Sequence, residues 1–534
     1  MFLANSMKLR SRVASTILFA LRKHSSVSAA AASERVKSYS EIPGPKPFPI
    51  IGNAWRFMPY ISSWDTSDFV KWSKAMLDQY GKIVKISNLP GRKDMILVFD
   101  PVIIAEVFKN EGPFPVRFQF QGVKYYREKV RPDFYEGFQG IFNELGESWL
   151  KARLILNQAM MSVAVANLYV PRVDQVSKDF VQLVKVLRDE KMEMPDNFKN
   201  EILKWTLESI ALVAYDTRLG CMKQNLDKDS DAQIMIDSIV NIFQLIYIMD
   251  LKIPLWKFFP TKTLRDMIKH SDNMLKVSQK YVELASAKFD FDAPETSDMS
   301  VLQRILKRDP NTKRAVIMGM DILFGGVDTT SNTASSALYY LACNPDKQEK
   351  LYQQLKSIIP SDPNESITSE HLTQCKYLRA CLKESMRLAS VTNGTIRTLP
   401  EDVVLGNYFI PKGRAEIYLF NSTLNVLEEH FPEADKYIPE RWLREGDSCP
   451  VRKASEAHPY TYLPFGRGLR QCPGMRFAYM EIETLIVRML LQFKLEWHYP
   501  PVKFISRALR TTISPLKFTI LDRDNASPPI QPQK

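Results

Sequence analysis

The longest uninterrupted helical stretch in the chain runs from Thr312 to Cys343. It follows Asp309-Pro310-Asn311 and stops at Asn344-Pro345, and both segments contain a proline that interrupts helices. A helix of about 32 residues is ~48 Å long, which is enough to cross a whole domain. Because the stretch is apolar nearly all round, we expect it to lie at the centre of the protein. The chain should therefore fold as one large, mainly α-helical domain around it.

The middle of this stretch contains residues that form helices poorly. The sequence FGGVDTTSN places Gly325 and Gly326 just before Asp328 and Thr329. Adjacent glycines remove side chains where a large group approaches the backbone, while the acid and the hydroxyl can bond to carbonyls and water. A helix kink with satisfied polar groups is the alternative explanation.

Alternating apolar and polar residues predict only small sheets beside the helices. The segment from Lys82 to Asp100 alternates around a Pro-Gly turn and predicts a hairpin, and the segment from Asp402 to Gly413 predicts short strands. Residues 34–53 contain clustered prolines and form an extended entry segment. Residues 54–522 are then expected to form the folded domain, and residues 523–534 a flexible tail.

The first 33 residues are expected to be a mitochondrial transit peptide. They contain five basic residues and no acidic residue, and their longest apolar run, Val13 to Leu21, is far shorter than the about 20 residues of a spanning helix. A short interfacial helix that is never removed is the alternative. The formal net charge of +12 falls to about +7 without these five charges. Since no dense basic tract remains, a nucleic-acid partner is not expected.

A glycine-rich loop near the end of the chain contains a single cysteine. The stretch PFGRGLRQCPG, from Pro464 to Gly474, surrounds Cys472 with glycine, proline and arginine. Six cysteines in 534 residues, none of them in a CxxC pair, are too few for a disulfide scaffold or a zinc finger. A surface turn needs no such arrangement. A buried thiolate bound to a metal can need it, because nearby backbone N–H groups and positive charge keep such a sulfur ionised.

Four short motifs precede this loop, and each is a weak signal by itself. GESWLKAR places a tryptophan and an arginine on one helix face, KESMR spaces an acid and an arginine three residues apart, IRTLPEDV puts an arginine before a strand, and PERW offers a further arginine. The residues in question are Trp149, Arg153, Glu384, Arg387, Arg397 and Arg441.

In this order, and followed by the cysteine loop, these motifs make the chain resemble the cytochrome P450 family from about Pro43 to about Thr519. The resemblance implies the single-domain P450 fold and haem b, with Cys472 as the axial thiolate ligand of the iron. It implies that Asp328 and Thr329 relay protons, and that Glu384, Arg387 and Arg441 form a buried ion network supporting the loop. The cofactor-binding residues that it implies are Trp149, Arg153, Arg397, Phe465, Arg470 and Cys472.

The implied reaction is monooxygenation of a lipophilic substrate. The leader resembles that of the mitochondrial clan, and the chain is similar to insect members of it, whose electrons come from NADPH through ferredoxin reductase and ferredoxin. Arg379, Lys383 and Arg476 are the expected ferredoxin contacts, although Met475 stands where the clan usually has a basic residue. The protein is then expected on the matrix side of the inner membrane, in peripheral contact through the run from Phe243 to Phe259.

The substrate is left open by the sequence. Segments around Arg117–Tyr126, Ile239–Leu251, Gly325–Val327 and Ser390–Ile396 are expected to line an apolar pocket. Xenobiotic metabolism is favoured, and an ecdysteroid-type steroid hydroxylase or a non-catalytic haem-binding relative are the alternatives. The Asp328-Thr329 pair argues against an enzyme that rearranges peroxides. An endoplasmic-reticulum protein served by a flavin reductase is the alternative location.

Overall fold

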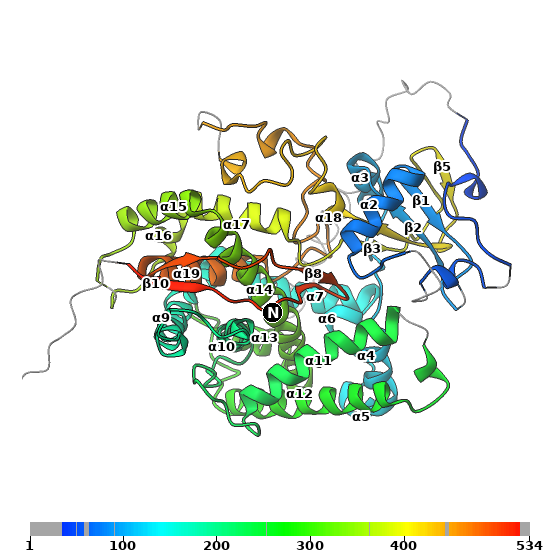
Figure 1. The fold of residues 1–534 in the computed structure, drawn as a ribbon. Coiled ribbons are helices and arrows are strands. Elements are labelled where there is room, and N and C mark those ends of the chain that lie inside the picture. Colours follow the sequence, from blue (N-terminus) through cyan, green and yellow to red (C-terminus); the bar gives the residue numbers. More distant parts are fainter. Residues whose placement is uncertain are drawn as a thin grey trace, which may run out of the picture.

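The computed structural model describes residues 35–49, 51–57, 64–89, 91–251, 254–362, 364–443 and 448–523. The expected transit peptide and all of the expected tail beyond Arg523 lie outside these residues. The described part is mainly helical with small sheets, as the sequence predicts. Figure 1 shows the helices filling most of the molecule and the largest sheet at one side.

The predicted central helix is α14 (Thr312–Cys343), with the bounds that the breakers indicate. The side chain of Asn311 caps its first turn by accepting from the backbone N–H of Arg314 at 3.2 Å. Four long helices pack against α14 and bury it (Figure 1). They are α10 (Phe198–Tyr215), α12 (Lys262–Ser286), α17 (Lys376–Leu388) and α19 (Met475–Gln492).

Further helices pack around these five or against the strands at the side of the molecule. They include α2 (Phe69–Tyr80), α3 (Pro101–Lys109), α7 (Gly146–Met160), α9 (Val170–Leu187), α11 (Asp231–Leu251), α13 (Val301–Arg308) and α15 (Pro345–Ile358). Of these, α2 and α3 pack against the strands. Among the described helices, only α11 is long and apolar enough to span a membrane. Half of that stretch is buried inside the protein, and α11 packs along α12 and against α14, as a core helix does.

The largest sheet has four strands in the order β1-β2-β6-β3. The predicted hairpin is confirmed, since β1 (Ile83–Ile86) and β2 (Asp94–Val98) pair in antiparallel register. The strand β6 (Ala415–Leu419) runs parallel to β2, and β3 (Thr395–Arg397) pairs antiparallel with β6. This pairing puts Arg397 at the end of β3, and its charge acts on Arg470 in the cysteine loop.

Among the described residues, three two-stranded sheets lie outside the main sheet. The predicted strands near residue 405 are confirmed as β4 (Val403–Leu405) and β5 (Tyr408–Ile410). The other two sheets come from the C-terminal part of the chain, β7 (Phe493–Glu496) with β10 (Thr519–Asp522) and β8 (Phe504–Ser506) with β9 (Arg510–Thr512). The hairpin β8–β9 contacts α14.

Candidate functional site

The cysteine loop leads directly into α19 and is closed by a backbone hydrogen bond. The N–H of Cys472 donates to the carbonyl of Phe465 at 2.9 Å. Gly466 and Gly468 adopt φ angles of +67° and +78°, which side chains disfavour. At Gly468 a Cβ atom would also lie 2.5 Å from a carboxylate oxygen of Glu111. Both glycines are therefore needed for this loop conformation.

The sulfur of Cys472 lies where a thiolate is partly stabilised. Desolvation raises the pKa of this thiol, whereas the backbone N–H groups of Gly474 and Met475 and the charges of Arg153 and Arg117 act to lower it. The N–H donors and positive charge expected from the sequence are thus present. Gly474 also lies beside the sulfur, but a Cβ atom there would be 3.9 Å from it, which is an ordinary contact. A side chain at position 474 would therefore not clash with the sulfur.

Two of the predicted cofactor-binding arginines connect α7 to the cysteine loop. The guanidinium carbon of Arg470 lies 3.6 Å from the centre of the Trp149 ring. Arg153, one turn further along α7, donates to the carbonyl of Gln471, the residue before Cys472. Trp149, Arg153 and Arg470 are all buried. The structure therefore brings the i and i+4 pair of α7 against the cysteine loop.

Arg397 and a fourth arginine complete the cluster. Arg397 is buried and donates to Glu111 at 2.6 Å. Arg117 donates to the carbonyl of Phe142 at 2.8 Å and acts electrostatically on Arg470. The sequence placed Arg117 in a pocket-lining segment but gave no sign that it joins the other arginines.

The cluster has more positive charge than its carboxylates balance. Desolvation, followed by the neighbouring arginines, lowers the pKa of Arg470 to about 8, and desolvation lowers the pKa of Arg117 and of Arg153 to about 10. Within the described residues, Glu111 is the one carboxylate that forms a salt bridge with any of the four. The Nε atoms of Trp149 and Arg153 are buried and find no hydrogen-bond acceptor there. Crowded guanidinium groups and free donors fit a bound anion.

The glycines of α14 accommodate protein side chains. A Cβ atom on Gly325 would lie 2.9 Å from the Phe142 ring, and one on Gly326 would lie 2.7 Å from the side chain of Ile210. The α-helical structure of α14 continues through both glycines. The hydroxyl of Thr329 donates to the carbonyl of Gly325 at 2.6 Å, the kind of bond that the sequence predicts for these residues.

Asp328 is the end of a polar chain that reaches across three elements. The amide of Asn332 donates to its carboxylate at 3.1 Å and accepts from the hydroxyl of Thr511, on β9, at 2.8 Å. Lys199, on α10, donates to the same hydroxyl. Desolvation raises the pKa of Asp328, and the charge of Lys199 opposes this. Lys199 and Thr511 were missed because they are remote from Asp328 in the sequence.

The predicted ion network is confirmed as a set of contacts. Glu384 accepts from Arg387 at 2.8 and 2.9 Å and from Arg441 at 3.0 Å, and all three side chains are fully buried. The indole N–H of Trp442 also donates to Glu384, at 2.8 Å. The Trp442 ring lies 4.5 Å from that of Tyr462, two residues before the cysteine loop. The network therefore connects to the start of the loop.

The expected ferredoxin contacts lie on α17 and α19, and one of them is paired with a carboxylate. Arg379 forms a bidentate ion pair with Glu483, with one oxygen at 2.7 Å, and its side chain is still 43% exposed. Desolvation, and then Arg379, lowers the pKa of the partly buried Lys383. Arg476 is exposed and donates to the carbonyl of Met161 at 2.8 Å.

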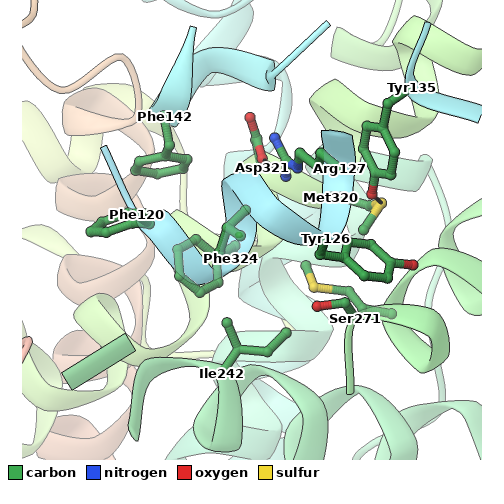
Figure 2. Close-up of a pocket in the computed structure, with 12 residues that line it drawn as sticks. Phe120, Tyr126, Arg127, Tyr135, Phe142, Ile242, Ser271, Met320, Asp321 and Phe324 are labelled. Carbon is green, nitrogen blue, oxygen red and sulfur yellow. Dashed lines mark hydrogen bonds and ion pairs between the residues drawn. The ribbon is translucent and has the colours of Figure 1, made fainter. Parts of the chain in front are cut away.

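A small cavity lies beside the N-terminal half of α14 (Figure 2). Its volume is about 30 Å³. Three phenylalanine rings stand on one side of it, and Tyr126, Tyr135 and Ser271 stand on the other. The first two expected pocket segments contribute to its lining, whereas Gly325–Val327 and Ser390–Ile396 do not. The lining residues are Phe120, Val123, Tyr126, Arg127, Tyr135, Phe142, Ile242, Ser271, Met274, Met320, Asp321 and Phe324.

Comparisons with known proteins agree with this geometry. The family model described as Cytochrome P450 matches residues 42–520. Probable cytochrome P450 49a1 of Drosophila melanogaster is 36% identical, over 92% of this chain and 84% of its own length. Probable cytochrome P450 301a1, mitochondrial, of the same species is 35% identical over 90% and 86%, and cytochrome P450 CYP12A2 of Musca domestica is 33% identical over 94% and 95%. The chain therefore belongs to the cytochrome P450 family of monooxygenases.

Proposed function

We propose that this protein is a mitochondrial monooxygenase that binds haem b through Cys472 and oxidises a lipophilic xenobiotic. The observation that carries the proposal is the buried arginine cluster beside the cysteine loop, with its unbalanced charge and the free donors of Trp149 and Arg153. Haem presents two carboxylates, which guanidinium groups bind well, and an iron that accepts a thiolate. Haem would therefore supply both the anionic groups that the arginine cluster lacks and a metal for the Cys472 sulfur.

The cofactor-binding residues have distinct tasks in this proposal. Bound haem supplies the activation of O2, and electron donation from a thiolate favours cleavage of the O–O bond. The carbonyl of Phe465 holds the backbone of Cys472, and two N–H groups after the cysteine bond to its sulfur. The residues proposed to bind the propionates are Trp149, Arg153, Arg397 and Arg470, and Arg117 joins them on the strength of its charge and position.

Asp328 and Thr329 are proposed to move protons at the reacting face of α14. A raised pKa lets the Asp328 carboxyl hold a proton closer to neutral pH than an exposed aspartate does, as a proton donor requires. Asn332 fixes the orientation of this carboxyl by donating to it. The Thr329 hydroxyl bonds to the Gly325 carbonyl in the structure and can rotate to donate elsewhere.

Electrons are proposed to arrive from NADPH through ferredoxin reductase and an acidic ferredoxin. The relatives named above include a mitochondrial P450, which supports a ferredoxin-type partner. Arg379, Lys383 and Arg476 are the proposed contacts. Since Glu483 pairs with Arg379, we expect ferredoxin to compete for a guanidinium that is already partly neutralised. The remaining contact is electrostatic, so ferredoxin binding should weaken with salt.

The matrix side of the inner membrane is the proposed location, with peripheral contact through the segment after α11. Part of the run from Phe243 to Phe259 lies outside the described residues. Within the described part, Leu255, Phe258 and Phe259 are exposed, and Phe258 is 75% exposed. Lys257 stands among them, which gives the apolar and basic mixture of an interfacial contact.

Reconstitution of electron transfer tests the proposed reaction. Purified protein is mixed with NADPH, ferredoxin reductase and ferredoxin, and oxidised product is measured by mass spectrometry with labelled ¹⁸O2. We expect one labelled oxygen atom in the product, and none when ferredoxin is left out. A flavin reductase that supports turnover while ferredoxin does not would contradict the proposed partner and location. Haem binding without any NADPH consumption would support a non-catalytic relative.

A further inference from the structure

Three phenylalanine rings from three other segments contact Phe324 of α14. Phe243, on α11, stacks on Phe324 with ring centres 4.2 Å apart and planes inclined by 10°. Phe142, in the short helix α6 (Gly140–Asn143), meets Phe324 edge-on at 5.5 Å, and Phe120, which precedes α4 (Gln121–Tyr125), does so at 6.2 Å. Figure 2 shows Phe120, Phe142 and Phe324 grouped on one wall of the cavity.

This cluster stands next to the residues proposed to move protons. Phe324 lies one helical turn before Asp328, so the two side chains project from neighbouring positions on one face of α14. The tip of the Phe142 ring fills the space that Gly325 leaves open. Gly325 in turn accepts the hydrogen bond of Thr329. A substrate that reaches this part of α14 must therefore contact the rings.

The rings leave no space for a substrate without moving. The cavity beside them, about 30 Å³, holds roughly one water molecule. Phe243 is only partly buried and comes from α11, whereas Phe324 is buried in α14. Separation of α11 from α14 would therefore open the stack at Phe243.

A flat aromatic ligand replaces the stacking that is lost when Phe243 and Phe324 separate, and a saturated ligand does not. Stacked aromatic pairs contribute more to binding than their buried area alone. A flat ring inserted between Phe243 and Phe324 replaces one stack with two. A saturated ring system is thicker and has no π face, so it loses the stack without replacing it.

We propose that the Phe243–Phe324 stack opens to hold a planar aromatic substrate, which makes these two residues determinants of specificity. The inference rests on the proposed monooxygenase function and names the class of its substrate. Phe120 and Phe142 form the edge-on wall of the same site. The site selects flat, fused aromatic compounds over saturated polycyclic compounds such as steroids.

Two ligands with the same carbon skeleton test this selection. The ferric holoprotein is titrated with phenanthrene, which is flat, and with perhydrophenanthrene, which is fully saturated. Binding is followed by the Soret shift and, independently, by quenching and competitive recovery of phenanthrene fluorescence. We expect phenanthrene to bind about tenfold more tightly, from one additional aromatic stack. Equal binding of the two, or tighter binding of perhydrophenanthrene, would overturn the inference.

Variants of the stack locate the effect. Phe243→Leu and Phe324→Leu keep apolar bulk and should reduce the preference to about twofold or less, while Phe243→Tyr keeps the ring and should retain it. Phe289→Leu is the matched control, since Phe289 pairs with Phe291 and with none of the four rings. Selectivity that persists in both leucine variants would contradict the assignment of these residues.

The reduced, CO-bound spectrum is recorded for every protein in the same series. A thiolate spectrum together with equal binding of the two ligands means that the substrate inference fails while the proposed function stands. A missing thiolate spectrum in the unmodified protein means that the proposed function fails.

Discussion

At the scale of single residues, the arginine cluster is the feature that most needs a bound group. Burial lowers the pKa of three of its guanidinium groups. Arginine nevertheless remains protonated in proteins, so the cluster keeps several positive charges away from water. This desolvation destabilises the fold, and a bound anion would offset it. Trp149, Arg153 and Arg470 could be predicted from the resemblance to the cytochrome P450 family, which rests on the motifs that contain them. Arg117 could not, because its place in the cluster depends on how the segment before α4 folds back.

Replacing Arg153 tests the role of this cluster. Arg153→Met should release haem roughly tenfold faster or more, since hydrogen bonds to charged groups contribute about 1.5–3 kcal/mol. Haem transfer to apomyoglobin measures the rate. Arg476→Met is the control, because Arg476 is exposed and bonds only to a carbonyl in the described structure. Equal haem loss in both variants would remove Arg153 from the cofactor site.

A pair of threonine variants distinguishes proton transfer by the Thr329 hydroxyl from its hydrogen bond within the helix. Thr329→Ala should retain haem, while product per NADPH falls roughly tenfold or more and hydrogen peroxide rises in its place. Thr333→Ala is the matched control, since its hydroxyl also donates to the carbonyl four residues earlier, at 2.9 Å. Normal coupling in Thr329→Ala would exclude this hydroxyl from proton transfer.

At the scale of elements, local patterns predicted local structure and failed for distant pairings. Proline and asparagine breakers indicated both ends of α14, and alternation indicated the hairpin of β1 and β2. The parallel pairing of β2 with β6 joins strands more than 300 residues apart, and no local pattern encodes it. The same limit hid the chain from Lys199 to Asp328, because its members come from α10, α14 and β9.

The contact between α4 and α11 is expected to respond to pH. Asp250, buried near the end of α11, accepts from the N–H of Gln121, the first residue of α4, at 3.2 Å. Desolvation raises the pKa of Asp250 to about 7, against the opposing effects of these backbone bonds, Arg92 and Lys257. The folded protein then holds a proton that the unfolded chain has lost, so the free energy of unfolding falls as pH rises from about 4 to about 7.

Asp250→Asn keeps an acceptor at this position and removes the titration. The exchange rates of the Gln121 and Gly122 amides are compared as the ratio of unmodified protein to Asp250→Asn. This ratio should rise as pH increases from about 4 to about 7 and level off at higher pH. The ratio cancels the intrinsic pH dependence of exchange. A ratio that stays constant across this range would show that ionisation of Asp250 does not loosen α4.

At the scale of the whole molecule, the exposed apolar segment after α11 predicts how the protein meets a membrane. Phe258 and Phe259 are 75% and 66% exposed. Burial of one large apolar side chain contributes about 1.5–3 kcal/mol, so replacing both with serine should weaken binding to anionic lipid vesicles tenfold or more, by rough estimate. Val186→Ser, at another exposed apolar position on α9, should not. Vesicle co-sedimentation measures the difference, and equal binding would contradict the proposed contact.

The central claim is that Cys472 provides a thiolate to a haem iron, and the spectrum of the reduced, CO-bound protein tests it most directly. The unmodified protein should show the red-shifted Soret band of thiolate ligation. Cys472→Ser should lose that band, and Cys449→Ser, at a partly exposed cysteine outside the loop, should keep it. A thiolate band that survives in Cys472→Ser would contradict the account.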